Sequence, residues 1–301
     1  MAAPTVKAWI TAFRLRTLPL ALSSVLLGSF LAAQYGIFKW PVAILAVTTT
    51  LFLQILSNLA NDYGDGVKGT DNEERIGPQR AIQSGEITTQ AMKRMIVVFV
   101  ILSLASGIGL ILVSFSDDMF TSLVFLLLGM LSIAAAIKYT MGKGAYGYHG
   151  LGDLFVFLFF GLTGVVGTFY LHTHVMEWEI FLAASAVGFL SAGVLNLNNM
   201  RDRISDKNSG KNTLVVKIGG EAAKMYHAFL IIGAVICTAL FILLEDIGAW
   251  AWIFLLTVPL FAKNLITVFK NKEPRLLDPL LKQLAISTLL FVLLLGVGSL
   301  L

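Results

Sequence analysis

Nine apolar stretches, each about as long as a membrane-crossing helix, follow one another along the chain. A helix needs roughly 20 mostly apolar residues to cross the hydrocarbon core of a bilayer. Charged residues make up only 13% of the sequence, against about a quarter in an average soluble domain, and the mean hydropathy is +0.82. We therefore predict an all-α, polytopic membrane protein with spans at about 17–35, 41–61, 92–113, 119–138, 152–172, 178–199, 222–244, 248–269 and 280–301.

The connections between these spans are short, so residues 1–301 are predicted to form a single integral-membrane domain. Two connections, at about residues 62–90 and 200–221, carry many charged residues and are expected to cap the bundle. The first is long for a helix connection and contains a Gly77-Pro78 break. These features favour an ordered functional loop over a plain connector.

Basic residues occur in alternate connections, which predicts the orientation of the chain. They are Lys7, Arg14, Arg16, Lys68, Arg75, Arg80, Lys93, Arg94, Lys138, Lys143, Arg201, Arg203, Lys207, Lys211, Lys217, Lys224, Lys270, Lys272, Arg275 and Lys282. By the positive-inside rule the amino terminus and both cap loops are cytoplasmic, and the carboxyl terminus is outside. We expect a multi-pass protein of the bacterial cytoplasmic (inner) membrane. The formal net charge of +4 reflects this asymmetry and gives no reason to expect nucleic acid.

Two acidic motifs stand at the cytoplasmic ends of apolar runs. Their residues are Asn61, Asp62, Asp65 and Asp71 in the first motif, and Asn198, Asp202 and Asp206 in the second. In a helix, four-residue spacing places side chains on one face, so each motif forms a polar stripe. Like charges at this spacing repel, and a divalent cation between the stripes would neutralise them. Hard oxygen ligands suit Mg²⁺, which keeps several waters and is shared with substrate phosphates.

Two other interpretations of the acidic residues stay open. They could form ion pairs with the bases Lys68, Arg75, Arg201 and Lys211. They could also belong to an ion pathway, because acids within a membrane are typical of transporters, although the centres of most spans hold no ionisable residue. A catalytic site explains more of the pattern. Metal and basic side chains would stabilise a departing diphosphate, and the apolar walls would hold a hydrocarbon chain.

The loop after the fourth span alternates glycine with tyrosine. Lys138-Tyr139 is followed by the segment Tyr146-Gly-Tyr148-His-Gly-Leu-Gly-Asp153. Glycine lets the backbone approach a ligand closely, and tyrosine offers a flat face with a polar tip. An interfacial aromatic belt explains the tyrosines but not Asp153, so we expect at least one of these residues to contact a ligand.

The remaining polar residues carry weaker signals. Arg14 and Arg16 fit a positive-inside anchor and a phosphate ligand equally well, and Lys211 could grip a diphosphate although its loop lacks P-loop spacing. His172 and His174 are predicted to be solvated loop residues outside the membrane. Small residues in the fifth and sixth spans predict close helix packing, and the last three spans are predicted to be scaffold.

The motifs together resemble those of the UbiA-type intramembrane aromatic prenyltransferases, over nearly the whole chain. The segments that carry the resemblance are Arg14-Leu-Arg-Thr-Leu-Pro19, Asn61-Asp-Tyr-Gly-Asp65 with Gly69 and Asp71, Gly77-Pro-Gln-Arg-Ala-Ile-Gln-Ser-Gly85, Tyr146-Gly-Tyr-His-Gly-Leu-Gly-Asp153, and Asn198-Asn-Met-Arg-Asp-Arg-Ile-Ser-Asp206 with Gly210-Lys-Asn-Thr213. The third and fourth segments are similar to the branch that prenylates 1,4-dihydroxy-2-naphthoate.

The resemblance implies nine helices around a central cavity that opens to the cytoplasmic side and laterally to lipid. It also implies Mg²⁺ held by Asp65, Asp71, Asp202 and Asp206, helped by Asn61 and Asn198. Asp62 stays an alternative to Asp71, which lies six residues after Asp65 instead of four. The expected catalytic residues are Asp65, Asp202, Asp206, Lys138 and Arg201. The expected substrate-binding residues are Arg14, Arg16, Lys68, Arg80, Lys138, Tyr139, Tyr146, Tyr148, Asp153, Arg201 and Lys211.

The reaction that the resemblance implies begins with ionisation of a polyprenyl diphosphate. The electron-rich ring of 1,4-dihydroxy-2-naphthoate then attacks the allylic cation, and loss of carbon dioxide gives demethylmenaquinol, which oxidises to demethylmenaquinone. Within the class, 4-hydroxybenzoate, homogentisate and haem are alternative acceptors. Outside the class, the alternative is a Mg²⁺-dependent ion transporter.

Overall fold

The structure, a computed structural model, describes residues 4–70 and 76–301, and every regular element in these residues is helical. The α-helices are α1 (Val6–Phe13), α2 (Leu18–Gln34), α3 (Trp40–Lys68), α4 (Thr89–Ser114), α5 (Met119–Lys138), α6 (Gly152–Val156), α7 (Gly167–Thr173), α8 (Ile180–Asn208), α9 (Leu214–Ile218), α10 (Gly220–Leu244), α11 (Val258–Lys270) and α12 (Asp278–Gly298). Shorter helical segments are η1 (Leu15–Thr17), η2 (Tyr146–His149), η3 (Phe157–Val166), η4 (Ala249–Thr257) and η5 (Pro274–Leu277).

Within the described residues, nine helical stretches are long and apolar enough to cross a membrane. Five are formed by α3, α4, α5, α8 and α10 alone, and the other four combine shorter pieces: α1 with α2, α6 with η3 and α7, η4 with α11, and η5 with α12. The predicted all-α fold with nine spans is therefore confirmed. In the fifth span the central piece, η3, is a π-helix, a wider coil that is frequent at functional sites.

Both acidic motifs lie on the spans themselves, because α3 and α8 continue past their apolar runs. α3 carries Asn61, Asp62 and Asp65 in its last turns and ends before Gly69, whose φ of 72° favours glycine. α8 likewise runs to Asn208 and carries the whole second motif. The helical stripes expected from the four-residue spacing are therefore present on both helices.

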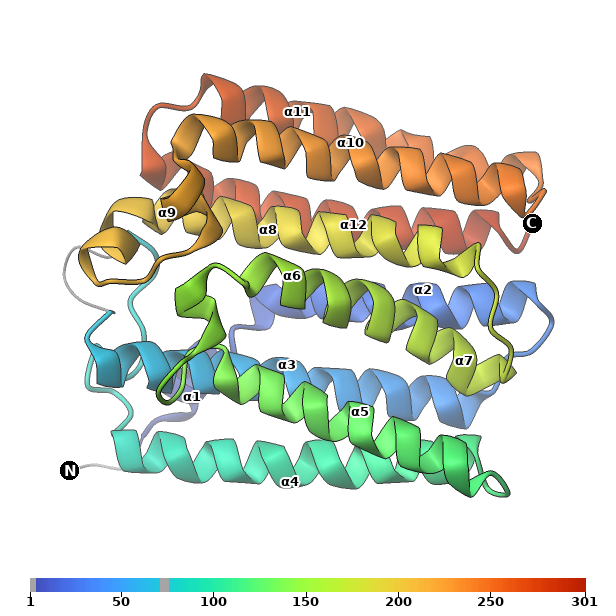
Figure 1. Ribbon diagram of the computed structural model, residues 1–301, viewed down its shortest axis with the longest axis horizontal. Coiled ribbons are helices and arrows are strands. Elements are labelled where there is room, and N and C mark those ends of the chain that lie inside the picture. The colour runs from blue at the N-terminus through green and yellow to red at the C-terminus, as the bar shows by residue number, and fades with distance from the viewer. Residues whose placement is uncertain (1–3, 71–75) are drawn as a thin grey trace.

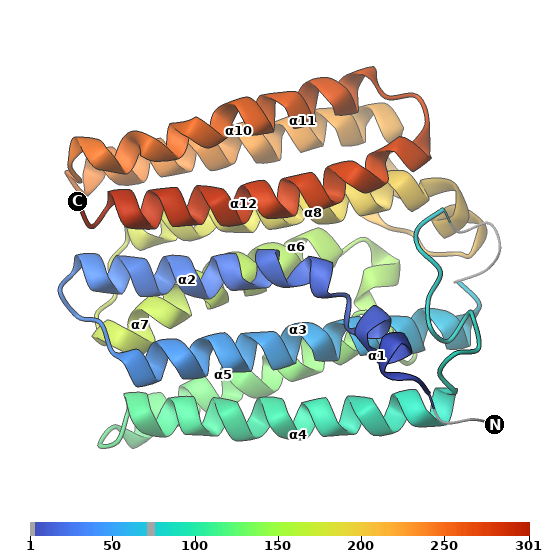
Figure 2. The ribbon, with the colours of Figure 1, turned by 180° about the vertical axis from the view of Figure 1, so that it is seen from behind.

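The spans lie side by side in an elongated bundle (Figure 1). From both sides α4 lies along one edge, and α10 and α11 lie along the opposite edge (Figure 2). Between them, α2 packs on α12, η3 and α7. The largest apolar core surrounds α8, where Val187 and Leu190 are fully buried. α1 and the end of α12 lie at opposite ends of the bundle, as an odd number of spans requires.

Small residues allow the close packing that the sequence predicts for the fifth span. A Cβ atom at Gly161 would lie 2.8 Å from the carbonyl oxygen of Ala184 and 2.8 Å from the Cα atom of Gly188, both on α8. At Gly164 a Cβ atom would lie 2.6 Å from the side chain of Ser24 on α2. Only glycine fits at these two crossings, so the packing prediction is confirmed.

The prediction that His172 is solvated is wrong. Its side chain is fully buried near the C-terminal end of α7, and its Nδ1 atom accepts a hydrogen bond of 3.2 Å from the backbone N–H of Lys39. Its Nε2 atom lies 3.2 Å from the hydroxyl of Ser29. The ring therefore links the first two spans to the fifth. The residues next to His172 in the sequence give no sign of this contact. His174 is exposed, as expected.

Gly161→Ala is expected to lower the free energy of unfolding by about 1–3 kcal/mol, because the added methyl group overlaps the backbone of α8. Gly167→Ala, in the same span, is the matched control, since a Cβ atom there meets nothing within 4 Å. Thermal unfolding of both purified variants in detergent measures the effect. Equal melting temperatures would contradict the packing described above.

Candidate active site

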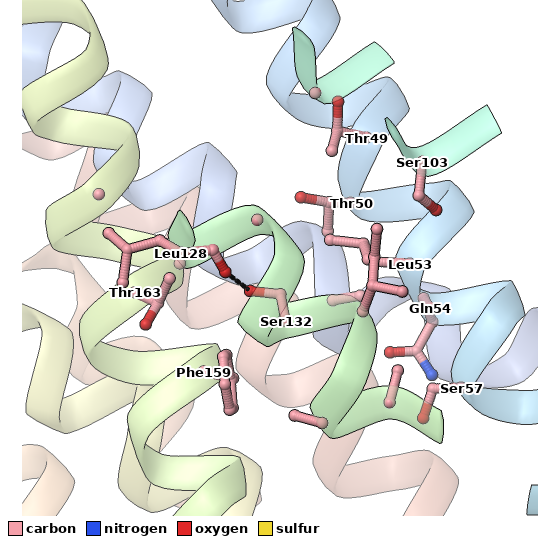
Figure 3. A pocket seen from close by; sticks show the side chains of 18 of the residues that line it. Thr49, Thr50, Leu53, Gln54, Ser57, Ser103, Leu128, Ser132, Phe159 and Thr163 are labelled. Atoms are coloured by element: carbon pink, nitrogen blue, oxygen red, sulfur yellow. Dashed lines mark hydrogen bonds between the residues drawn. The ribbon is translucent and has the colours of Figure 1, made fainter. Parts of the chain in front are cut away.

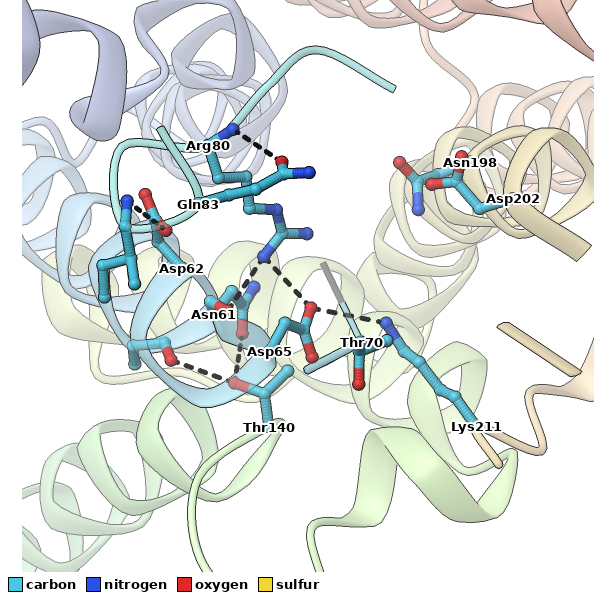
Figure 4. A network of polar contacts seen from close by, with 12 residues as sticks. Asn61, Asp62, Asp65, Thr70, Arg80, Gln83, Thr140, Asn198, Asp202 and Lys211 are labelled. Carbon is cyan, nitrogen blue, oxygen red and sulfur yellow. Dashed lines mark hydrogen bonds and ion pairs between the residues drawn. The ribbon is translucent and has the colours of Figure 1, made fainter. Parts of the chain in front are cut away.

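Asp65 is the most heavily paired side chain at the end of α3. Its carboxylate is 1% exposed and lies 3.0 Å from the guanidinium of Arg80 and 3.5 Å from the ammonium of Lys211. The hydroxyl of Tyr148 donates a hydrogen bond of 2.8 Å to the same carboxylate. Burying a carboxylate requires such partners, and they come from three separate loops. Figure 4 shows two of them, Arg80 and Lys211, beside Asp65. Arg80, Tyr148 and Lys211, all predicted to bind substrate, are thus brought together.

Lys211 joins the two acidic motifs. Its Nζ atom lies 3.5 Å from Asp65 on α3 and 3.9 Å from Asp206 on α8, so one ammonium pairs with a carboxylate of each motif. The backbone N–H of Lys211 also donates to the carbonyl of Asp206 at 2.8 Å, which turns the chain back over the end of α8. The prediction that the two motifs meet at one mouth of the bundle is therefore supported by a direct contact.

The electrostatics of this cluster keep Lys211 charged. Burial lowers the pKa of the Lys211 ammonium, but the carboxylates of Asp65 and Asp206 raise it by more, so the net shift is upward. Burial and the nearby Asp65 carboxylate likewise raise the pKa of the Tyr148 hydroxyl. At neutral pH the site therefore contains a protonated lysine and a neutral tyrosine.

Asp62 forms hydrogen bonds with the first of the two cap loops. Its carboxylate accepts hydrogen bonds from the backbone N–H groups of Ala81, at 3.2 Å, and Ile82, at 3.4 Å. The guanidinium of Arg80 also donates to the carbonyl of Asn61 at 2.9 Å, so residues 80–82 are tied to α3 at several points. This geometry favours a structural role for Asp62 over metal binding. Asp71, the other candidate of the first motif, lies outside the described residues.

Arg201 is held by protein oxygens rather than presented to the mouth. Its side chain is fully buried and donates to both oxygens of Asp202, at 2.9 and 2.7 Å, and to the amide oxygen of Asn198 at 2.9 Å. A further donor reaches Asp278, the first residue of α12. The expectation that Arg201 grips a diphosphate directly does not agree with this arrangement. It orients Asp202 instead.

The structure does not bring every predicted residue to this cluster. Lys138 is exposed at the end of α5, and no ion pair joins it to either motif within the part of the chain that the structure describes. Arg16 pairs with Asp278 at 3.7 Å, and Arg14 lines a separate cavity with Arg16 and Arg80. Lys68 does join the cluster, because its ammonium lies 4.0 Å from the centre of the Tyr148 ring.

A cavity of about 350 Å³ lies below the first motif, between α2, α3, α4, α5 and the fifth span. Its lining reaches Asn61 at the mouth and includes Tyr139, Tyr146 and Phe159. Figure 3 shows several hydroxyl groups on its walls, and one of them, on Ser132, donates to the carbonyl of Leu128 at 2.8 Å. This hydroxyl is satisfied by its own helix, whereas the hydroxyls of Ser24, Thr49 and Ser103, which also line the cavity, have no hydrogen-bond partner among the described residues.

The two cavity tyrosines are oriented by their neighbours. The hydroxyl of Tyr146 donates to the carbonyl of Ala135 at 2.9 Å, and its ring stacks on Phe155 with 4.0 Å between centroids. Tyr139 meets the Tyr146 ring edge to face. These contacts leave a rigid aromatic wall beside the mouth. Asp153, in contrast, is buried and takes no part in the cavity lining among the described residues.

The acidic residues fit a Mg²⁺ ion that is shared with a phosphate ligand. No three His, Cys, Asp or Glu side chains in residues 4–70 and 76–301 are close enough to hold a metal by themselves. Mg²⁺ needs no such cage, since it is usually bound by one or two carboxylates, waters and substrate phosphates. Asp65, Asp202 and Asp206 are 1%, 5% and 5% exposed, respectively, and each is paired with a base, so their oxygens are held ready at the mouth.

Comparison with known proteins identifies the class. The family described as the UbiA prenyltransferase family has a model that matches residues 21–297, and the chain belongs to this family. The resemblance noted from the motifs is therefore confirmed.

Two bacterial relatives are similar to the chain over nearly their whole length. The 1,4-dihydroxy-2-naphthoate octaprenyltransferase of Escherichia coli is 46% identical over 291 residues, which cover 95% of this chain and 94% of the relative. The protein of the same name from Haemophilus influenzae is 43% identical over 299 residues, which cover 98% of this chain and 96% of the relative.

A solved structure has the same fold. It is a UbiA homolog from Archaeoglobus fulgidus bound to GPP and Mg²⁺, with a TM-score of 0.63 and 19% sequence identity. The match covers 96% of this chain and 99% of that one. At this level of identity the similarity concerns the fold, which agrees with the nine spans described above.

Asp278 is the residue at this site that the sequence did not reveal. The last three spans were predicted to be scaffold, and this is wrong for the start of α12, because Asp278 contacts both Arg201 and Arg16. The available signal in the sequence is an acid among the bases Lys272, Arg275 and Lys282 of the connection before the last span. Its partners lie far away in sequence, so the signal alone does not identify them.

Asp62→Asn is expected to lower the free energy of unfolding by about 1–2 kcal/mol, because the cap loop loses hydrogen bonds to a charged acceptor. The Mg²⁺ concentration that gives half-maximal activity should stay unchanged. Thermal unfolding and hydrogen exchange of residues 80–82 measure the first effect, and a Mg²⁺ titration of activity measures the second. A raised Mg²⁺ requirement with unchanged stability would instead identify Asp62 as a metal ligand.

Proposed function

We propose that this chain transfers a polyprenyl group from polyprenyl diphosphate to 1,4-dihydroxy-2-naphthoate, with release of diphosphate and CO₂. The product is demethylmenaquinol, which oxidises to demethylmenaquinone. Two relatives with 46% and 43% identity are named for transfer to this acceptor. The protein would act as a multi-pass protein of the bacterial inner membrane, with its amino terminus in the cytoplasm, as the distribution of basic residues predicts.

The single observation that carries the proposal is the ammonium of Lys211 between Asp65 and Asp206. It means that the carboxylates of both motifs converge at one mouth, with the apolar cavity directly below. A prenyl diphosphate has the same division, since its head is strongly anionic and its tail is a hydrocarbon. We infer that the head binds at the cluster and that the tail enters the cavity.

The proposed metal is Mg²⁺, with Asp65, Asp202 and Asp206 as its carboxylate ligands and Asn61 and Asn198 beside them. Support comes from the Archaeoglobus homolog bound to GPP and Mg²⁺. When bound, the ion would supply positive charge to the departing diphosphate. Asp71 stays a candidate ligand, as the sequence predicts.

The basic residues of the chain would stabilise the same leaving group. Lys211 is buried and charged, and Arg80 is fixed at 3.0 Å from Asp65. Cationic donors that are oriented before the reaction lose little free energy to reorganisation when negative charge develops on the leaving oxygen. We therefore assign to Lys211 and Arg80 the role that the sequence analysis gave to Arg201 and Lys138.

The aromatic wall of the cavity suits the cation that ionisation produces. The faces of Tyr139, Tyr146 and Phe155 carry negative partial charge, which attracts cationic groups. An allylic cation beside them would be shielded from water, and the flat naphthalene ring could approach along the same wall. Loss of CO₂ from the ring restores aromaticity, so the reaction needs no strong base to remove a ring proton.

The tail is proposed to leave the cavity toward lipid between α5 and η3. α5 packs on α3 and α4, and the cavity lining passes from Ser132 on α5 to Phe159 and Thr163 on η3. The outer side of α5 is apolar and exposed, for example at Leu127. Such an opening would allow chains longer than the cavity to bind.

The acceptor is tested by incubating the purified protein with polyprenyl diphosphate, Mg²⁺ and one acceptor at a time. Only 1,4-dihydroxy-2-naphthoate is expected to release both diphosphate and CO₂. The comparison acceptors are 4-hydroxybenzoate, homogentisate and haem. Equal turnover with 4-hydroxybenzoate, without CO₂, would contradict the proposed acceptor, and absence of diphosphate release with all four would contradict a prenyltransferase.

Asp202→Asn is expected to lower the turnover number at least about 100-fold, because a neutral amide cannot replace a metal-binding carboxylate. The variant is expected to fold, because Arg201 keeps Asp278 as a partner, but its unfolding temperature should fall, since a buried ion pair is lost. Glu221→Gln is a matched control, since Glu221 is an exposed acid that pairs with Lys224 away from the site. Near-normal turnover of Asp202→Asn would argue against metal ligation by Asp202.

A further inference from the structure

Arg201 is shared between two carboxylates that come from different spans. Its Nε and Nη2 atoms bond to Asp202 at 2.9 and 2.7 Å, while its Nη1 atom bonds to Asp278. The side chain of Arg201 is 0% exposed and that of Asp278 is 35% exposed. A fully buried guanidinium therefore has a proposed metal ligand on one side and an acid at the edge of solvent on the other.

Asp278 lies at a helix N-terminus and contacts a second base besides Arg201. It is the first residue of α12, where the helix dipole favours a negative charge. Its second oxygen lies 3.7 Å from the guanidinium of Arg16, which precedes α2. The acid thus connects the first, sixth and ninth spans at the level of the acidic motifs. Its neighbour Leu277 is buried in the core around α8, so the start of α12 is held against that helix.

We propose that Asp278 is a positioning residue of the metal site, acting through Arg201 on Asp202. By taking part of the charge of Arg201, it weakens the hold of the guanidinium on Asp202 and leaves that carboxylate available to a divalent cation. This inference rests on the proposed function, since it assumes that Asp202 binds metal. It assigns a chemical role to the last span, which otherwise contributes packing.

Two cations compete for the carboxylate of Asp202. Arg201 and a divalent cation both attract Asp202, and the attraction is strong because the pair is buried. The guanidinium contacts carboxylates on two sides. In a variant with a neutral side chain at position 278, the whole charge of Arg201 would act on Asp202, so the cation would have to displace a tighter ion pair. Loss of a negative charge near the site acts in the same direction.

The test is a Mn²⁺ titration of the purified full-length protein in detergent, followed by electron paramagnetic resonance, with and without inorganic pyrophosphate. Asp278→Asn keeps an oxygen for Arg201 but removes the charge, and is expected to raise the Mn²⁺ dissociation constant roughly 10- to 100-fold. Asp278→Glu should recover most of the affinity. Glu273→Gln is the matched control, because it removes one exposed charge from the same connection and should leave the constant unchanged.

A second variant covers the case in which Asp278→Asn does not fold. Arg16→Gln releases Asp278 from its other partner, so Asp278 should draw Arg201 more strongly and Mn²⁺ should bind roughly twofold tighter or more in the absence of pyrophosphate. Arg16 is partly exposed, which favours folding of this variant. Weaker Mn²⁺ binding by Arg16→Gln would contradict the proposal.

The outcomes separate the two proposals. A wild-type protein that binds no Mn²⁺ and transfers no prenyl group overturns the proposed function, and the inference with it. A wild-type protein that does both, together with a folded Asp278→Asn variant of unchanged Mn²⁺ affinity, overturns only the inference. A purely structural role for Asp278 would lower the unfolding temperature and leave the Mn²⁺ dissociation constant unchanged.

Discussion

One buried ammonium holds the two acidic motifs together at one mouth of the bundle. Lys211 pairs with Asp65 from the second span and with Asp206 from the sixth. Without a cation between them, these carboxylates would repel each other in a poorly solvated position. The backbone N–H of Lys211 bonds to the carbonyl of Asp206 and so fixes the turn that carries Lys211. The ion pairs of Lys211 therefore depend on the extension of α8 beyond its apolar part.

Pairing of buried acids with bases also organises other parts of the site. Arg80 brings the cap loop to Asp65, and Arg201 orients Asp202. The interpretation of the acids as ion-paired groups agrees with the geometry for Arg201 and Lys211, while Lys68 contacts Tyr148 and Arg75 lies outside the described residues. These pairs are compatible with metal binding, because they keep the carboxylate oxygens oriented at the mouth. An anionic diphosphate would meet cations that are already in position, which is how electrostatic catalysis avoids reorganisation.

The apolar half of the site follows a different logic. The cavity is formed where α2 to α5 and the π-helical η3 surround a space that the core around α8 does not fill. Glycines at the contacts of the fifth span with α8 and α2 let the helix backbones approach closely. Gly167, in contrast, lines the cavity, and a Cβ atom there would meet no other atom within 4 Å. Small residues therefore serve both packing and space, and the sequence alone predicted the first use more clearly than the second.

The sequence by itself determined the nine spans, the all-α class and the two acidic stripes, because hydrophobicity and helical period are properties of consecutive residues. It also indicated the family through its motifs. Only the tertiary structure decided which base contacts which acid. Arg80 and Lys211 pair with Asp65, and Arg201 pairs with Asp202. Lys138 is exposed, and Asp278 reaches the site from the last span. Those pairings join residues that are far apart in the chain, and the physical reason is that a buried charge takes the partner that packing brings nearest, which no local pattern records.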